Sequence, residues 1–447
     1  MARAALWLYS ALTWAAQPLL KRKLRRRAVA EPGYAQHIEE RFGRYQDSYP
    51  DSAAPSSHAG PLIWIHAVSL GETRAAAILL TALRQQLPGM RLLLTHGTAT
   101  GRAEGTKLLQ PGDMQVWQPW DTRAAVARFL QRFRPAVGLL METELWPNLV
   151  AGCHVHGVPL ALVNARLSDT SQRQAQRLAW LARPAYAALT AVWAQTELDA
   201  QRLRSLGAPV QGVFGNLKFD VVPDAEQWTQ GRVWRSHSPR PVVLFASSRE
   251  GEEALLIDNL VSKRPIAQSI RALTAIKSGV NQRDDVQWLI VPRHPQRFDE
   301  VAQLLEGAGL SVSRRSQWAN DPVAADVWLG DSLGEMALYY GLADVALLGG
   351  SFAPLGGQNL IEAAACGCPV VLGPHTFNFA EAAELACAAG AAQRVADMAQ
   401  GVETACALAQ DSAALAQAQR TAAQFAQAHR GAAQATVVAV AGLLERV

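Results

Sequence analysis

The chain has 447 residues, a length that favours two domains of about 200 residues each over a single core. Hydrophobic residues make up 49% of it and charged residues only 18%, which excludes a disordered chain. The net charge is +4, but residues 1–30 carry seven basic groups and no acid, so the remainder stands at +4 less seven, or −3. A basic body that binds nucleic acid is therefore disfavoured.

Several familiar chemical signatures are missing. Five cysteines, an odd number, favour a reducing compartment over a disulfide framework, and the lone C-x-C of Cys366 and Cys368 is better explained by small buried residues than by zinc. No P-loop and no strand-linked G-x-G-x-x-G occurs, which disfavours P-loop nucleotidases and dinucleotide enzymes. Without a D-x-D triplet, a metal held on a nucleotide-sugar diphosphate is not indicated.

The N-terminus joins an apolar stretch, residues 4–20, to a basic one, residues 21–27. This order is the reverse of a secretory signal peptide. The stretch is at the short limit for a membrane-spanning helix, while Trp7, Trp14 and the basic cluster also suit an interfacial helix on anionic lipid. A helix docked on the protein, followed by a solvated basic tail, is a further alternative. Both membrane interpretations make residues 1–30 an anchor and keep the body of the protein on the cytoplasmic side.

From residue 61 onward, short apolar runs alternate with helical patterns, as in parallel sheets covered by helices. Buried strands are predicted at 62–67, 91–96, 136–141, 159–164 and 191–195, and in a second series at 241–247, 286–292, 344–350 and 369–374. Helices are predicted at 71–87, 122–133, 171–189 and 196–206, and the Ala- and Gln-rich end, 403–447, is also expected to be helical.

A Gly- and Pro-rich stretch separates the two series, with the boundary near residues 221–232. We therefore expect an α/β protein with two doubly wound parallel sheets, one in residues 31–225 and one in residues 226–447. Ligands bind such sheets at the carboxyl ends of their strands, which in tandem domains surround a cleft.

The segment HAVSLGETRAA (66–76) leads from a strand into a helix. Ser69 and Glu72 are spaced as a capping box, which explains them structurally. A carboxylate at a helix N-terminus is also held ionised, and one that faces a cleft is able to accept a proton from a substrate hydroxyl. Spacing alone leaves both interpretations open.

The segment METELWPN (141–148) also follows a buried strand. Glu142 and Glu144 fall where cleft residues lie. Alternatively, a helix begins at Trp146 and Pro147, and the two acids complement its dipole.

A Gly-rich loop follows the predicted strand at 344–350, in the segment 348–374. Glycines let backbone approach a ligand, and a helix start near Gln358 offers N–H groups to a phosphate. Asn359 and Glu362 share a helix face, where a carboxylate suits the hydroxyls of a ribose. A plain turn is the alternative.

Two further segments end strands of the second half: ASSREGEE (246–253) and VPRHP (291–295), in which Arg293 is available for a phosphate. Together with the Gly-rich loop they predict a nucleotide site.

These motifs resemble the bacterial 3-deoxy-D-manno-octulosonic acid (Kdo) transferases of lipopolysaccharide synthesis. The resemblance covers nearly the whole chain and rests on ERFGRY (40–45), HAVSLGE (66–72), METELWPN (141–148), VNARLS (163–168), GNLKFD (215–220), ASSREGEE (246–253), VPRHP (291–295), LGDSLGE (329–335) and GGSFAPLGGQNLIEAAACGCPVVLGPHTFNF (349–379).

The resemblance implies a GT-B fold, in which two Rossmann-like domains face a cleft, with an N-terminal membrane-associating helix. It implies inverting transfer of Kdo from CMP-Kdo to a lipid A precursor (lipid IVA) at the cytoplasmic face of the inner membrane, without a metal or another cofactor. Nucleic acid is not among the expected partners.

The resemblance also assigns roles to residues. Glu72 becomes the general base, and Glu142 and Glu144 face the donor sugar or the acceptor. The implied CMP contacts are Pro292, Arg293, Leu333, Gly334, Glu335, Asn359, Leu360, Ile361 and Glu362, with Ser247, Ser248, Lys218 and Ser351 as further contacts. Arg249 and Gln358 depart from the family pattern, which commonly has His at both positions.

Two alternatives remain. One is another membrane-associated GT-B enzyme, such as a UDP-GlcNAc-dependent lipid glycosyltransferase. The other is a membrane-tethered nucleotide-binding protein without catalysis. Competition by CMP or UDP separates the first from a Kdo transferase, and product formation separates the second.

Overall fold

The computed structural model describes residues 2–46, 60–262 and 286–446. The chain divides into two compact units. Unit 1 consists of Met1–Asp220 and His429–Val447, and unit 2 of Val221–Ala428.

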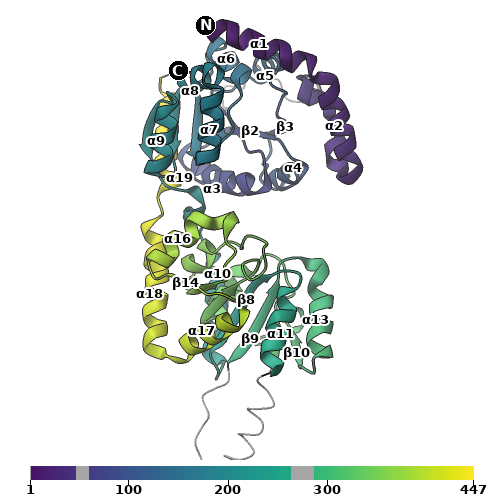
Figure 1. Ribbon diagram of the computed structural model, residues 1–447, viewed down its shortest axis with the longest axis vertical. Helices are drawn as coiled ribbons and strands as arrows, with labels where there is room; N and C mark the ends of the chain where they lie inside the picture. Colours follow the sequence, from purple (N-terminus) through teal and green to yellow (C-terminus); the bar gives the residue numbers. More distant parts are fainter. Residues whose placement is uncertain (1, 47–59, 263–285, 447) are drawn as a thin grey trace, which may run out of the picture. The chain divides into compact units, whose positions relative to one another are not determined.

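Unit 1 contains a parallel seven-stranded sheet with helices on both faces (Figure 1). The strand order is β3-β2-β1-β4-β5-β6-β7. The strands are β1 (Leu62–His66), β2 (Arg91–His96), β3 (Met114–Trp117), β4 (Val137–Met141), β5 (Leu160–Ala165), β6 (Ala191–Ala194) and β7 (Val210–Val213). The helices are α1 (Ala2–Ala15), α2 (Gln17–Ala30), α3 (Leu70–Gln86), α4 (Ala99–Thr106), α5 (Arg123–Phe133), α6 (Pro147–Val155), α7 (Asp169–Arg177), α8 (Ala179–Ala187), α9 (Glu197–Ser205) and α19 (Ala432–Leu444).

Unit 2 contains a second parallel seven-stranded sheet, with the order β10-β11-β9-β8-β12-β13-β14. Its strands are β8 (Val242–Ser248), β9 (Gln287–Pro292), β10 (Val312–Arg314), β11 (Val327–Leu329), β12 (Val345–Leu348), β13 (Val370–Leu372) and β14 (Ala392–Arg394). Its helices are α10 (Ala225–His237), α11 (Glu252–Ser262), α13 (Phe298–Gly307), α14 (Met336–Leu342), α15 (Ile361–Ala365), α16 (Ala380–Ala388), α17 (Met398–Gln410) and α18 (Ser412–Ala428).

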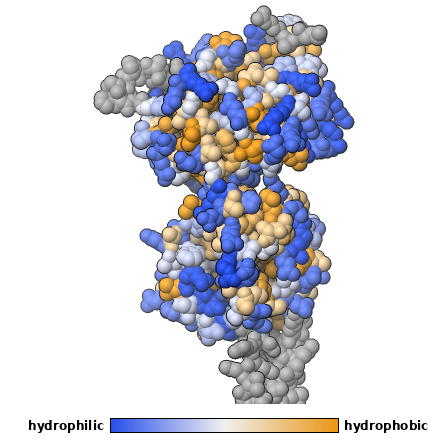
Figure 2. All heavy atoms as spheres, turned by 90° about the vertical axis from the view of Figure 1, so that its left-hand side faces the viewer, coloured by the Kyte–Doolittle hydropathy of each residue, from blue (hydrophilic) through white to orange (hydrophobic). Residues whose placement is uncertain are grey.

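The strands form apolar runs because both of their faces are buried. In β1, Leu62 and Trp64 pack into one core while Ile63 and Ile65 pack into another on the opposite face. On the face of each unit that Figure 2 shows, hydrophilic residues are interspersed with hydrophobic ones. Every strand predicted from the sequence is confirmed.

The strands that the sequence did not predict are β3, β7, β10, β11 and β14. Each has only three or four residues, and all but β11 lie at a sheet edge. Such short segments carry too little apolar pattern to be distinguished from loops.

Two predicted helical regions differ in the structure. The single helix expected at 171–189 is divided at Leu178, whose φ of −106° and ψ of 30° lie outside the helical range, and Pro184 interrupts the bonding of α8. The expected helical end of the second domain is three helices, α17, α18 and α19, and the last belongs to unit 1. The carboxylate of Asp220 accepts hydrogen bonds from the N–H groups of Gly431 and Ala433 at its start.

The apolar N-terminus forms two helices, with Pro18 in the first turn of α2. Among the described residues, no helix combines the length and the apolar character that crossing a bilayer demands. Helix α1 packs against α6 and α8 of unit 1 (Figure 1).

Candidate active site

Glu72 lies in the first turn of α3, directly after β1. A variant of the predicted capping box is present: Ser69 Oγ accepts the N–H of Glu72 (3.4 Å), and the Glu72 carboxylate accepts from Ser69 Oγ (3.0 Å) and from the N–H of Val68 (2.8 Å), the residue before the cap. Burial raises the pKa of Glu72 to about 7, against the lowering effect of these hydrogen bonds. A carboxyl group with that pKa exchanges a proton near neutral pH, as a general base requires.

Glu142 follows β4 directly and is almost fully buried. Its backbone adopts a left-handed conformation with φ of 59°, which is strained for a residue with a Cβ and is found most often at functional sites. Its carboxylate accepts a hydrogen bond from Arg166 Nε (2.6 Å), and Lys218 Nζ lies 3.9 Å from its other oxygen. Glu142 is thus held by two cations that come from distant segments of the chain.

Glu144 is half-buried two residues further along. Its carboxylate accepts a hydrogen bond from Trp146 Nε1 (2.8 Å), while burial raises its pKa. The expected helix start is also present, because α6 begins at Pro147.

The three carboxylates are close enough to interact electrostatically. The charges of both Glu142 and Glu144 raise the pKa of Glu72. Glu72, Glu142 and Arg166 follow β1, β4 and β5, which are neighbours in the sheet. The cluster therefore lies at the carboxyl ends of these strands. Within the described ranges, no three His, Cys, Asp or Glu side chains are grouped as metal ligands.

Lys218, which was expected among the nucleotide contacts, belongs to unit 1 and lies beside Glu142. Arg166 was not singled out from the sequence, although VNARLS contains it. Its signal is its position directly after a buried strand.

In unit 2, three of the residues expected at the nucleotide act electrostatically on two buried tyrosines of α14. Burial raises the pKa of Tyr340 well above its usual value, the charge of Glu362 adds to that rise, and the charge of Arg293 opposes it. Burial also raises the pKa of Tyr339, and the charge of Glu335 adds to that rise. The segment after β9 and the helix α15 thus carry charges within electrostatic range of Tyr340, and the segment after β11 carries one within range of Tyr339.

The other residues predicted to contact CMP differ in exposure and in the hydrogen bonds that they make. Leu333 is 70% exposed, and Gly334 has a positive φ of 80°. Leu360 and Ile361 are fully buried, backbone included. Asn359 is occupied locally, because its Oδ1 accepts the N–H of Ile361 (3.0 Å).

Three serines were expected at the nucleotide, and two of them are buried in structural hydrogen bonds. Ser351 Oγ donates to the carbonyl of Leu348 and accepts the N–H of Gly373 (2.8 Å). Ser248 Oγ donates to Glu253 Oε1 (2.8 Å). Ser247, at φ of 56°, is the one that is partly exposed at the end of β8.

A buried ion pair that the sequence did not indicate supports this edge of unit 2. Arg297 Nη1 lies 2.7 Å from Glu253 Oε1 and its Nη2 lies 3.0 Å from Glu300 Oε1. Through Ser248 the pair joins the end of β8 to the segment after β9, where Pro292 and Arg293 lie. Burial is the main cause of the lowered pKa of His294, and the charge of Arg249 lowers it further. Arg249 is therefore within electrostatic range of the segment after β9.

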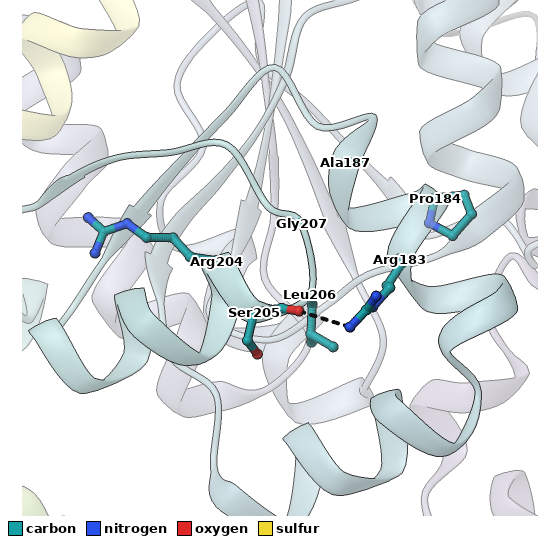
Figure 3. A pocket seen from close by; sticks show the side chains of 7 residues that line it. All are labelled: Arg183, Pro184, Ala187, Arg204, Ser205, Leu206 and Gly207. Carbon is teal, nitrogen blue, oxygen red and sulfur yellow. Dashed lines mark hydrogen bonds between the residues drawn. The ribbon is translucent and has the colours of Figure 1, made fainter.

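A hollow between α8 and α9 is separate from the predicted site residues (Figure 3). Its lining consists of Arg183, Pro184, Ala187, Arg204, Ser205, Leu206 and Gly207. Arg183 Nη2 lies 3.5 Å from the carbonyl of Ser205. Arg183 also borders a groove between α1 and α8, which Leu8 and Trp180 line.

Comparisons with known proteins agree with these observations. The family model of 3-deoxy-D-manno-octulosonic-acid transferase (kdotransferase) matches residues 36–221. The 3-deoxy-D-manno-octulosonic acid transferase of Bordetella pertussis is 50% identical over 363 residues, 80% of each chain. That of Haemophilus influenzae is 31% identical over 379 residues, 83% of each chain. A glycosyltransferase from Rickettsia africae has the same GT-B fold, with a TM-score of 0.50 at 13% identity, over 87% of this chain and 99% of its own.

Proposed function

The chain belongs to the 3-deoxy-D-manno-octulosonic acid (Kdo) transferase family, and from that premise we propose that it moves Kdo from CMP-Kdo to a lipid A precursor by a single inverting displacement. The enzyme is a glycosyltransferase of lipopolysaccharide synthesis. The observation that carries the proposal is the carboxylate of Glu72, whose pKa of about 7 is set by burial beside two further carboxylates.

In the proposed reaction, Glu72 takes the proton from an acceptor hydroxyl. The oxygen then forms a bond to the anomeric carbon of Kdo while the bond from that carbon to the CMP phosphate breaks and its electron pair leaves with CMP. Glu142 and Glu144 face the donor sugar or the acceptor, and Arg166 and Lys218 hold Glu142 in its strained conformation.

The proposed CMP site lies at the carboxyl edge of the unit 2 sheet. Arg293 stabilises the phosphate as its charge develops, because a guanidinium pairs with phosphate oxygens. Glu362 takes the ribose hydroxyls. The charges of Glu362 and Arg293 both act on the pKa of Tyr340, which supports one common site. Pro292, Leu333, Gly334 and Glu335 complete the set, together with residues 359–361. No metal and no other cofactor takes part in the proposal.

The proposed membrane contact is made by residues 1–30, on the cytoplasmic face of the inner membrane. Trp7, Leu12, Trp14 and Leu19 are between 60% and 71% exposed. The basic residues of α2 follow directly and suit anionic headgroups. The groove beside Leu8 and Trp180, bordered by Arg183, extends this apolar and basic character onto α8.

Turnover tests the reaction. The chain is incubated with CMP-Kdo generated in situ and a tetra-acylated lipid A precursor, and products are read by mass spectrometry. A mass gain of one or more Kdo units is expected, with inhibition by CMP and not by UDP. Glu72→Gln should retain the fold, since Gln also serves in a capping box, and should lose nearly all turnover. Turnover like that of the wild type would refute the role of Glu72. Inhibition by UDP and not by CMP would favour the rival donor.

Co-sedimentation with vesicles of anionic phospholipid tests the anchor. Deletion of residues 1–30 should abolish binding. Because deletion also removes Ser10, whose Oγ lies 2.7 Å from Asn148 Oδ1 at the start of α6, it disturbs unit 1 as well. A second variant therefore replaces the exposed Arg22, Arg25 and Arg26 by Glu and should weaken binding without changing the fold. Unchanged co-sedimentation of both variants would contradict the proposal.

A further inference from the structure

Glu252, at the start of α11, is a fully buried carboxylate whose four hydrogen-bond donors are all backbone N–H groups. Oε1 accepts from Phe352 (3.0 Å) and Ala353 (3.1 Å). Oε2 accepts from Gly350 (2.7 Å) and Arg249 (3.0 Å).

The three donors Gly350, Phe352 and Ala353 belong to the Gly-rich loop that follows β12. Successive N–H groups that converge on one point form a concave anion site. In this chain a side chain of the protein fills that site. The sequence suggested that the loop offers its backbone to a ligand, but these three N–H groups are already paired with Glu252.

The fourth donor, Arg249, lies after β8, which is the neighbour of β12 in the sheet. Glu252 therefore joins the two loops that follow adjacent strands at the carboxyl edge. The Gly-rich loop is further closed by the N–H of Gly357, which donates to the carbonyl of Gly350 (2.7 Å), and it leads directly to Asn359–Glu362. The conformation of the loop thus determines where the proposed CMP contacts lie.

We propose that Glu252 is a positioning residue for the donor nucleotide, an internal anion that holds the Gly-rich loop and the loop after β8 in the form that binds CMP. The inference rests on the proposed function, because it takes CMP as the ligand. A carboxylate is needed because it accepts at both oxygens, whereas an amide at the same place turns an NH₂ group toward N–H donors.

Glu252→Gln tests this with two readouts. Hydrogen exchange followed by mass spectrometry should show lost protection of the amides at 350–353 in the free protein. Calorimetric titration should show CMP affinity lowered at least tenfold, and the KM for CMP-Kdo should rise while the KM for the lipid acceptor does not.

Asp344→Asn is the matched control. Asp344 is a buried carboxylate of the same unit, just before β12, and it accepts from Arg235 Nε (2.6 Å) and from the N–H of Val242 (2.8 Å) at the opposite edge of the sheet. The Asp344→Asn substitution should lower the melting temperature while leaving CMP affinity and the exchange protection of the amides at 350–353 unchanged. If Glu252→Gln does not fold, Glu252→Asp, which keeps the charge but shortens the reach, should show the same losses in milder form.

Normal CMP affinity in a Glu252 variant that has lost loop protection would overturn the inference, as would equal loss of affinity in Asp344→Asn. Failure of the proposed function has a different signature. If the wild type binds UDP and not CMP, the donor assignment is wrong, and the same variants are then compared with UDP.

Discussion

Two opposing effects set the pKa of Glu72. Burial and the neighbouring carboxylates raise it, while the N–H of Val68 and the hydroxyl of Ser69 lower it. The capping box could be predicted from the spacing of Ser69 and Glu72, but the value of about 7 could not. It depends on Glu142 and Glu144, which lie some seventy residues away in the chain, and on burial that only the folded sheet provides.

The pH dependence of turnover should change when Glu142 is replaced by Gln. A general base must be ionised, so we expect kcat/KM of the wild type to rise with pH and level off above about 7. Glu142→Gln removes a negative neighbour of Glu72 and no longer offsets the positive charges of Arg166 and Lys218, and both changes favour the ionised form of Glu72. The acid limb of the residual activity should move to lower pH by about one unit.

Glu144→Gln is the control for this experiment. The charge of Glu144 is the smallest of the named influences on Glu72, so its removal should move the profile in the same direction by less. A profile that stays in place in Glu142→Gln, or moves to higher pH, would show that Glu72 is not the titrating base.

At the scale of elements, the central strands were predictable because a strand buried on both faces must be apolar throughout. The short edge strands and the division of residues 1–30 into two helices were not. Docking of the N-terminal helix on the protein was among the alternatives, but the segment that it contacts could not be predicted. Tyr9 donates a hydrogen bond to Asp121, whose carboxylate accepts the N–H groups of Asn148 (3.0 Å) and Leu149 (2.8 Å) in the first turn of α6. The expected anchor is therefore also part of the framework behind Glu142 and Glu144.

Tyr9→Phe should destabilise the protein in a pH-dependent manner. Burial raises the pKa of Asp121 to about 6, and the bond from Tyr9 opposes that shift. At pH 8 Asp121 is ionised and the lost bond should cost about 1.5–3 kcal/mol. At pH 5 the carboxyl is largely protonated, the bond is between neutral groups, and the cost should fall by about half.

Urea unfolding at the two pH values measures this difference. Tyr186→Phe is the control, because Tyr186 is a tyrosine of α8 whose pKa is raised by burial alone. Its effect should be the same at both pH values. Equal costs at pH 5 and pH 8 for Tyr9→Phe would mean that Asp121 does not receive its hydrogen bond.

At the scale of the whole molecule, the chain passes from unit 1 to unit 2 and then returns to unit 1 with its last helix. An Ala-rich helix with an apolar face could be predicted at the C-terminus, but nothing in that face says which sheet it covers. In the structure α19 returns to unit 1, where Val437 and Val440 are buried in the same core as Leu79 and Leu83 of α3. The boundary expected from composition therefore placed the last helix in the other domain.

Removal of residues 429–447 should consequently damage unit 1 and spare unit 2. Val437, Val440 and Leu443 are buried in the core of unit 1, and each contributes about 1.5–3 kcal/mol by leaving water. We expect the truncated chain to lose turnover and the cooperative unfolding of unit 1, while CMP binding, which we assign to unit 2, is retained. Asp220→Asn, which weakens the start of α19 without removing it, should lower the melting temperature of unit 1 by a smaller amount. Loss of CMP binding together with normal unfolding of unit 1 would mean that α19 supports the nucleotide site, and would contradict its assignment to unit 1.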